Sequence, residues 1–197
     1  MRRNSRLKLE FFNKYEFPQI TTDEKYVQGW FGKHHHRTLL PLVKNKKLIL
    51  ELGSWLGKSA IKWLENSNAN VICVDTWEGS IEHKSKRYKA LLPKLKDLFL
   101  TNLEPWRGRV FPLQMKTING IAELYKYNII PDFIYIDASH EYEDVYMDLA
   151  LCHSYFPKAL ISGDDWKWES VNKAVITYCD KNQIKVVNDG SVWYLDH

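Results

Sequence analysis

The feature that most constrains this chain is a regular alternation of short apolar runs with stretches of helical spacing. After residue 46, runs of β-type residues are separated by segments whose apolar residues recur three or four positions apart. The runs are Lys47–Leu52, Asn70–Asp75, Arg109–Leu113, Asp132–Asp137 and Ala159–Ser162, and the helical segments are Ser59–Asn66, Tyr88–Leu103, Thr117–Tyr127, Tyr142–Ser154 and Glu169–Lys181. Strands connected by helices run parallel, and near-continuous apolar strands are typical of a sheet covered on both faces.

The end of the chain departs from this alternation. Ile184–Val187 and Ser191–Leu195 are short β-type runs joined by Asn188-Asp189-Gly190. A tight Asp-Gly turn predicts a hairpin, so the last strand is expected to run antiparallel. The sequence therefore predicts an α/β fold: a Rossmann-like, doubly wound, mostly parallel seven-stranded sheet with a C-terminal antiparallel hairpin.

Residues 1–197 are expected to form a single domain, because no linker divides them and the length suits one core. Residues 1–20 lack periodicity, whereas Thr22–Val43 has a helical pattern with Thr22 or Asp23 as its N-cap. Residues 1–45 are therefore expected to be an arm and a helix that cover the site. The polar stretch Gly79–Lys89 is expected to lie over one edge of the sheet.

Composition excludes several classes of protein. A chain that is 45% hydrophobic and 14% aromatic is not disordered, and no apolar run approaches the roughly 18 residues of a membrane helix. The start of the chain lacks the apolar segment of a signal peptide, so we expect a cytoplasmic protein that does not associate with a membrane. A net charge of +4 is too small for a dedicated nucleic-acid binder, whereas a homo-oligomer is left open. Cys73, Cys152 and Cys179 are expected to be buried, reduced thiols.

A glycine loop, Glu51–Ser59 (ELGSWLGKS), follows the first apolar run. Its glycines allow a sharp turn close to a ligand, and the next helix presents free N–H groups. Gly57-Lys58-Ser59 matches the end of a P-loop, but only three residues separate Gly53 from Gly57, where a P-loop has four. The G-x-G-x-x-G pattern of dinucleotide folds is absent. The segment is instead similar to the E-x-G-x-x-x-G loop that opens S-adenosylmethionine-dependent methyltransferases, and a P-loop-like nucleotide site is the less favoured alternative.

A second acid follows the next strand. Asp75 lies 22 residues after Gly53, where a carboxylate can hold both hydroxyls of a ribose. The residues expected near the adenine come from two strand ends and are Thr76, Trp77, Met115, Lys116 and Thr117. Glu51 is a charged residue at the end of a buried strand and therefore requires a partner.

Three further carboxylates are expected to share one edge of the sheet. Asp137 ends the fourth apolar run, and Asp164 and Asp165 follow the fifth. Crowded carboxylates repel one another unless one is protonated or a cation lies among them. Helix capping accounts for one such acid but poorly for all three. We therefore predict a site for a divalent cation, with Mg²⁺ the expected ion because it prefers oxygen ligands.

Histidines occur beside this site and near the N-terminus. His140 follows Asp137 by three residues, and a histidine there suits a general base. Consecutive helical residues point in different directions, so His34, His35 and His36 cannot all bind one ion. They are expected to form a solvated or lid-facing basic patch.

Together these segments resemble the class I methyltransferases, and more narrowly the metal-dependent O-methyltransferases of the macrocin and mycinamicin sugar type. The resemblance runs from about Trp30 to the C-terminus. It rests on the glycine loop, on DASHEYEDVYMDL (137–149), and on GDDW (163–166) followed by VNKA (171–174). It implies methyl transfer from S-adenosylmethionine to a hydroxyl of a small molecule or glycan, a sugar hydroxyl being expected, held by Mg²⁺.

The resemblance also implies roles for individual residues. The donor would be bound by Glu51, Gly53, Ser54, Gly57, Ser59 and Asp75, and the metal by Asp137, Asp164 and Asp165. Some relatives carry a second acid two residues after the first metal aspartate, where it is the proposed base. This chain has Ser139 there, so the base is His140 or no single side chain.

An RNA methyltransferase is the remaining alternative. It would use basic residues near the N-terminus and in the polar stretch as a phosphate track: Arg2, Arg3, Arg6, Lys8, Lys84, Lys86, Arg87 and Lys89.

The eight tryptophans are expected to divide between site and core. Those expected at the mouth of the site are Trp55, Trp77, Trp166 and Trp168, joined by Trp30. Those expected in the core are Trp63, Trp106 and Trp193.

Overall fold

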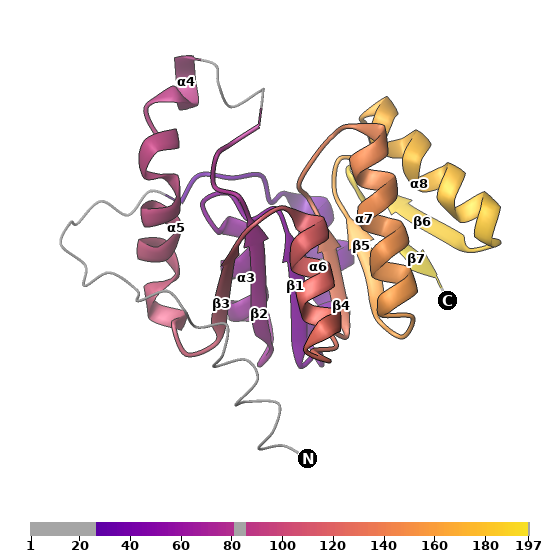
Figure 1. Ribbon diagram of the computed structural model, residues 1–197, viewed down its shortest axis with the longest axis horizontal. Helices are drawn as coiled ribbons and strands as arrows, with labels where there is room; N and C mark the ends of the chain where they lie inside the picture. Colours follow the sequence, from indigo (N-terminus) through magenta and orange to yellow (C-terminus); the bar gives the residue numbers. More distant parts are fainter. Residues whose placement is uncertain (1–26, 81–85, 197) are drawn as a thin grey trace.

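A seven-stranded sheet forms the middle layer of the computed structural model, which describes residues 27–80 and 86–196 (Figure 1). The strands are β1 (Leu48–Leu52), β2 (Asn70–Asp75), β3 (Val110–Gln114), β4 (Phe133–Ile136), β5 (Leu160–Gly163), β6 (Lys185–Asp189) and β7 (Val192–Asp196). Their order is β3-β2-β1-β4-β5-β7-β6, with β1 to β5 parallel and β7 antiparallel to both neighbours. This confirms the predicted doubly wound sheet with its antiparallel C-terminal hairpin.

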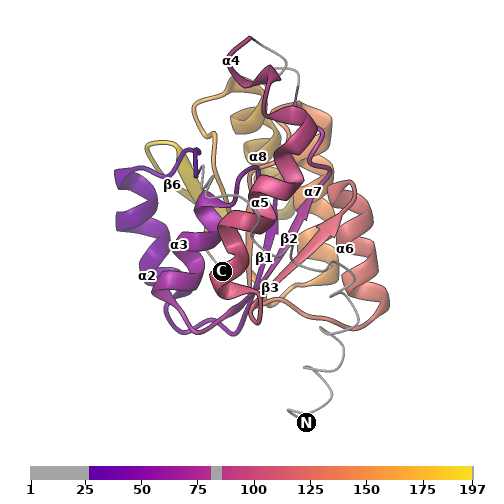
Figure 2. The same cartoon turned by 90° about the vertical axis from the view of Figure 1, so that its left-hand side faces the viewer.

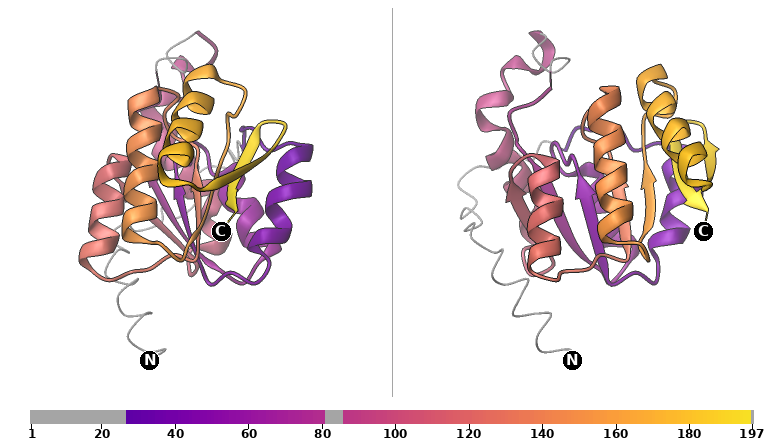
Figure 3. Two further views of the ribbon diagram at one scale, coloured as in Figure 1. Left: turned by 90° about the vertical axis from the view of Figure 1, so that its right-hand side faces the viewer. Right: turned by 45° about the vertical axis from the view of Figure 1, so that its right-hand side comes forward.

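Helices cover both faces of the sheet (Figures 2 and 3). One face carries the π-helical turn η1 (His35–Leu39), α2 (Leu40–Val43), α3 (Lys58–Asn66) and α5 (Leu95–Leu103). The other carries α6 (Thr117–Lys126), α7 (Tyr142–Tyr155) and α8 (Glu169–Asn182). The short elements are α4 (Lys86–Lys89), η3 (Leu92–Lys94) and η4 (Glu104–Trp106).

The central strands supply both cores, because successive side chains point to opposite faces. In β1, Leu50 and Leu52 pack toward α6, α7 and α8, whereas Ile49 packs toward α3 and α5. Trp63 and Trp193 are fully buried, one in each core, as predicted. The predicted buried thiols are also confirmed, since Cys73, Cys152 and Cys179 are buried and free. No helix in residues 27–80 and 86–196 is long and apolar enough to cross a bilayer.

Two helix predictions are wrong in extent. The predicted N-terminal helix Thr22–Val43 is not helical between residues 27 and 32, because Gly29 and Gly32 interrupt the pattern. Its predicted N-cap lies outside the described residues. The predicted helix Tyr88–Leu103 is divided into α4, η3 and α5, since Pro93 lacks the N–H that a continuous helix needs.

The terminal turn and the polar stretch differ in detail from the prediction. Asp189 pairs with Val192, so the turn consists of Gly190 and Ser191, and Asp189 is the last strand residue. The expected insertion Gly79–Lys89 falls partly outside the described residues.

One carboxylate is buried between helices rather than at a strand end. Asp148 of α7 is 2% exposed, and its Oδ1 accepts a 2.7 Å hydrogen bond from the hydroxyl of Thr117. Burial raises the pKa of Asp148 from 3.8 to about 7. When the pKa of an acid is higher in the folded state than in the unfolded state, the protein loses stability as the pH rises from the unfolded-state pKa through the folded-state pKa.

Asp148→Asn should therefore stabilise the protein more at pH 8 than at pH 5. The amide can still accept the bond from Thr117 but carries no charge, so the gain in unfolding free energy is expected to grow by roughly 1–3 kcal/mol over this range. Urea denaturation at both pH values measures it. Glu143→Gln, an exposed change on the same helix, serves as the control. A gain that does not change with pH would contradict the assigned cause.

Candidate functional site

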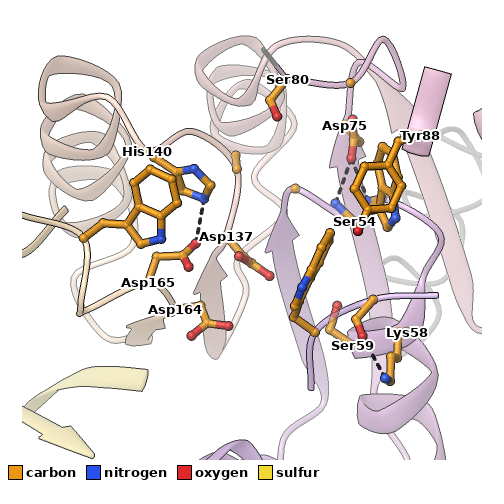
Figure 4. Close-up of a pocket in the computed structure, with 17 residues that line it drawn as sticks. Ser54, Lys58, Ser59, Asp75, Ser80, Tyr88, Asp137, His140, Asp164 and Asp165 are labelled. Carbon is orange, nitrogen blue, oxygen red and sulfur yellow. Dashed lines mark hydrogen bonds and ion pairs between the residues drawn. The ribbon is translucent and has the colours of Figure 1, made fainter. Parts of the chain in front are cut away.

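A cavity of about 380 Å³ opens at the carboxyl ends of the parallel strands (Figure 4). A second cavity, of about 440 Å³, adjoins it and shares Gly53, Asp75 and His140. The predicted donor residues that line one or both cavities are Gly53, Ser54, Ser59, Asp75, Thr76, Lys116 and Thr117. Glu51, Gly57 and Trp77 line neither of them. The predicted carboxylates Asp137, Asp164 and Asp165 all line the first cavity.

The glycine loop lies directly on the end of β4. Gly53 has φ +85°, and a Cβ there would lie 2.0 Å from the carbonyl oxygen of Asp137. Gly57 has φ +82°, and a Cβ there would lie 2.2 Å from a methyl of Leu103. Both positions therefore exclude a side chain, but Gly57 does so because of packing against α5 rather than against a ligand.

Glu51 lies beneath this loop rather than in the cavity. It is fully buried within β1, and Oε1 accepts the indole N–H of Trp63 at 2.9 Å. Oε2 accepts the hydroxyl of Ser54 at 2.5 Å and faces the thiol of Cys73 at 3.6 Å. Burial raises the pKa of Glu51, while these hydrogen bonds act in the opposite direction. The carboxyl group thus anchors the loop through Ser54.

Asp75 anchors the loop from the other side. Its Oδ2 accepts the backbone N–H groups of Ser54 and Trp55 at 2.9 and 2.8 Å, and its Oδ1 accepts that of Trp77 at 2.7 Å. Trp55 and Trp77 have φ of 48° and 53°, a left-handed conformation that costs free energy outside glycine. The carboxylate stabilises both strained turns while it lines both cavities.

Trp77 points away from the predicted adenine position. The centroid of its ring lies 4.8 Å from that of Phe99, and the residue is 4% exposed. Its indole N–H donates a hydrogen bond to the carbonyl of Trp55 at 3.1 Å. The tryptophans that line the first cavity are Trp30, Trp55 and Trp168. Trp166 and Trp106 pack against the two cores, so Trp106 lies where it was expected and Trp166 does not.

Each carboxylate that follows β5 has a histidine partner. Oδ2 of Asp164 lies 2.7 Å from Nε2 of His35, and Oδ2 of Asp165 lies 2.8 Å from Nε2 of His140. The tyrosine hydroxyl of Tyr135 also donates to Oδ2 of Asp164, at 3.3 Å. In Figure 4, Asp164 and Asp165 lie on one side of the cavity, and Asp137 lies between them and the glycine loop.

Burial and neighbouring groups shift the pKa values of Asp137 and Asp164 in opposite directions. Burial, followed by repulsion from Asp164 and Asp165, raises the pKa of Asp137 well above its usual range. Burial would also raise the pKa of Asp164, but the hydrogen bond with His35 acts against this and the pKa is lowered.

Three carboxylates line this cavity, but they are not arranged as a closed metal cage. Among the residues that the structure describes, no three His, Cys, Asp or Glu side chains are arranged to hold a metal ion. However, Oδ1 of Asp164 is buried, and within the described chain no group donates a hydrogen bond to it. A cation that prefers oxygen ligands would give this buried carboxylate oxygen a partner. It would also reduce the charge repulsion at Asp137.

The prediction of a solvated histidine patch is wrong for His35. His35 is 3% exposed, whereas Nδ1 of His34 lies 2.9 Å from Asp189 and His36 is exposed with its ring edge against Phe31. The signal was present in the sequence, because Phe31, His35, Leu39 and Val43 recur every four residues and all four are buried. A histidine in that stripe faces the sheet.

The segment before η1 covers the glycine loop. Oε1 of Gln28 accepts the indole N–H of Trp55 at 2.8 Å, and the carbonyl of Gly29 accepts Nζ of Lys58 at 2.7 Å. Gln28 and Gly29 therefore lie against the glycine loop. Lining residues to which the sequence analysis gave no role are Gly29, Lys58, Gly79, Ser80, Tyr88 and Ala138. Lys58 and Ala138 lie within the glycine loop and the 137–149 motif, whereas the other four belong to neither.

Comparisons with known proteins give a family. Residues 50–166 match the family model described as "Methyltransferase domain". The chain matches no curated protein sequence significantly, whereas more than two hundred chains of solved structures match it.

Three solved structures illustrate the fold. An O-methyltransferase from Bacillus cereus in complex with SAH is 15% identical with a TM-score of 0.61, covering 99% of this chain and 91% of its own. A TDP-rhamnose 3′-O-methyltransferase of calicheamicin biosynthesis is 14% identical with a TM-score of 0.54, covering 98% and 93%. Fibrillarin, a pre-rRNA processing protein of Methanococcus jannaschii, is 13% identical with a TM-score of 0.52, covering 78% and 66%. At these identities the likeness shows a shared fold.

Gly53→Ala should disrupt the glycine loop. Because the added Cβ would meet a backbone oxygen at 2.0 Å and the residue has positive φ, we expect a loss of at least about 2 kcal/mol in unfolding free energy. Gly108→Ala is the matched control, since a Cβ there meets nothing within 4 Å, and it should change stability by less than about 1 kcal/mol. Urea denaturation of both variants decides. Equal stability of the two would show that the loop is not seated on β4 as described.

Proposed function

The chain belongs to the methyltransferase domain family, and from that premise we propose that it transfers a methyl group from S-adenosylmethionine to a hydroxyl oxygen. One observation carries the proposal: the cavity beneath the glycine loop also contains Asp137, Asp164 and Asp165. A donor bound by the loop would therefore present its methyl group to an acceptor held at the carboxylates.

The donor fits the two adjoining cavities. Asp75 lines both and is placed to accept hydrogen bonds from ribose hydroxyls. Thr76, Lys116 and Thr117 line the second cavity, which suits the adenine, while Ser54 and Ser59 line the first, which suits the amino-acid end. The SAH-bound Bacillus cereus enzyme with the same fold supports this choice of donor.

The carboxylates would hold a divalent cation, for which we propose Mg²⁺, with Asp137, Asp164 and Asp165 as ligands. When bound, such a cation is a Lewis acid that lowers the pKa of an acceptor hydroxyl. The orphaned Oδ1 of Asp164 and the repulsion at Asp137 support this assignment.

His140 is the proposed general base. Asp165 holds its Nε2 at 2.8 Å, and Trp168 stacks on the imidazole with ring centroids 4.3 Å apart. An imidazole oriented in this way can accept the proton of the acceptor hydroxyl. With S-adenosylmethionine held by the glycine loop, the oxygen would attack the sulfonium methyl in line. The carbon–sulfur bond would break with its electron pair left on sulfur, which gives S-adenosylhomocysteine. Positioning of the two reactants supplies much of the rate.

A sugar hydroxyl, free or in a larger glycan, is the proposed acceptor. Trp30 and Trp168 line the cavity and are 55% and 46% exposed, and aromatic surface of this kind suits contact with a sugar ring. The likeness to a TDP-rhamnose methyltransferase supports this class. The RNA alternative depends on Arg2, Lys84 and other basic side chains outside the described residues, and no observation favours it.

S-adenosylhomocysteine should stabilise the wild-type protein against heat, whereas ATP with Mg²⁺ should not. At a concentration one hundred times its Kd, a ligand adds about 2.7 kcal/mol, so we expect a rise of roughly 5–10 °C in Tm. Differential scanning fluorimetry with each nucleotide measures it. A rise in Tm with ATP but not with S-adenosylhomocysteine would favour the P-loop interpretation and contradict the donor assignment.

Methyl transfer should depend on a divalent cation. Release of S-adenosylhomocysteine, measured with a panel of nucleotide sugars and other glycosides, is expected to fall about 100-fold or more in EDTA and to recover with Mg²⁺. Asp164→Ala should lose as much activity, while Asp180→Asn, an exposed change on α8, should lose none. Activity that persists in EDTA and in Asp164→Ala would refute the metal assignment.

In the same assay, His140→Ala should lower kcat by about 100-fold or more, because the general base is lost. An unchanged kcat would show that His140 is not the base.

A further inference from the structure

We infer that His35, from the helical turn before β1, positions Asp164 so that Oδ1 is the atom presented to the cation. The inference rests on the proposed function, because it assumes that Asp164 is a metal ligand. It concerns a residue that neither the glycine loop nor the strand-end motifs include.

His35 is held in place from the rest of its own turn. It is buried in the π-helical turn η1, where the N–H of Leu40 bonds to the carbonyl of His35. Its ring packs 4.6 Å from that of Phe31. Single π-turns widen a helix locally and frequently occur at functional sites. Packing within its own turn therefore fixes the imidazole independently of its contact with Asp164.

The hydrogen-bond network assigns the tautomer of His35. The backbone N–H of Gly32 donates to Nδ1 at 3.2 Å, so Nδ1 acts as an acceptor. In a neutral imidazole the proton then lies on Nε2, which is the nitrogen 2.7 Å from Oδ2 of Asp164. His35 is thus a donor directed at one oxygen of the carboxylate.

The other contacts of Asp164 leave its second oxygen available. The hydroxyl of Tyr135 donates to the same Oδ2, and the indole N–H of Trp193 donates to the backbone carbonyl at 2.9 Å. Both the side chain and the backbone are therefore oriented, while no described group donates to Oδ1. Partners that orient a ligating carboxylate in this way typically change metal affinity 10- to 100-fold when they are removed.

The turn that carries His35 is docked independently of Asp164. The carboxylate of Asp189, at the end of β6, lies 2.9 Å from Nδ1 of His34. It also accepts hydrogen bonds from Nε of Arg37 at 2.9 Å and from the hydroxyl of Thr38 at 2.6 Å. Loss of one of these contacts leaves the other two. His34→Ala is therefore a matched control that alters a neighbouring histidine without touching the site.

The test is the affinity of the purified protein for Mn²⁺, a spectroscopic substitute for Mg²⁺, measured by electron paramagnetic resonance without substrates. His35→Asn keeps a polar side chain but reaches only as far as Nδ1, whereas His35→Gln places an amide N–H near the position of Nε2. We expect Mn²⁺ affinity to fall 10- to 100-fold in His35→Asn and to stay within about threefold of wild type in His35→Gln and His34→Ala. Circular dichroism and Tm establish that each variant is folded.

The outcomes separate this inference from the proposed function. Tight Mn²⁺ binding by wild type with equal affinity in folded His35→Asn would overturn the role of His35 and leave the metal assignment standing. No Mn²⁺ binding by wild type would overturn both the metal assignment and the role of His35. Weak binding in His35→Asn that His35→Gln restores is the expected result, and a purely structural role would lower Tm without that rescue.

Discussion

Carboxylates that are buried at the carboxyl ends of the strands require hydrogen-bond partners, and much of this structure depends on that requirement. Glu51 lies wholly inside β1 and is held by an indole and a hydroxyl, while Asp75 is held by three backbone N–H groups. Asp164 and Asp165 each have a histidine. Because an uncompensated buried charge costs several kcal/mol, the elements that supply these partners must dock in one arrangement.

The core and the site consequently share residues. Trp63 and Trp193 are fully buried and fill opposite faces of the sheet, yet each uses its indole N–H to hold an acid-bearing segment, one at Glu51 and the other at the carbonyl of Asp164. A buried indole requires a hydrogen-bond acceptor, so packing and site geometry are satisfied together. This explains why tryptophan is abundant both at the cavity and in the layers behind it.

Strain at the mouth of the cavity has a similar origin. Trp55, Trp77 and Asp165 are non-glycine residues with positive φ, and each lies at or next to a carboxylate that lines the site. Such conformations persist only where surrounding contacts determine them. The hydrogen bonds of Asp75 to Trp55 and Trp77, and the contact of His140 with Asp165, supply those contacts.

The sequence alone determined the layered α/β sheet, the succession of strands and helices along the chain, and the strand ends at which Asp75, Asp137, Asp164 and Asp165 lie. Hydrophobic periodicity and local turn chemistry are encoded in consecutive residues. It also placed His140 beside Asp137. Only the tertiary structure decided that Glu51 supports the loop from below, that Trp77 turns toward Phe99, and that His35 reaches Asp164 across 129 positions of the chain. Those outcomes depend on which faces meet when distant elements pack, and no local pattern encodes the partner of a buried polar group.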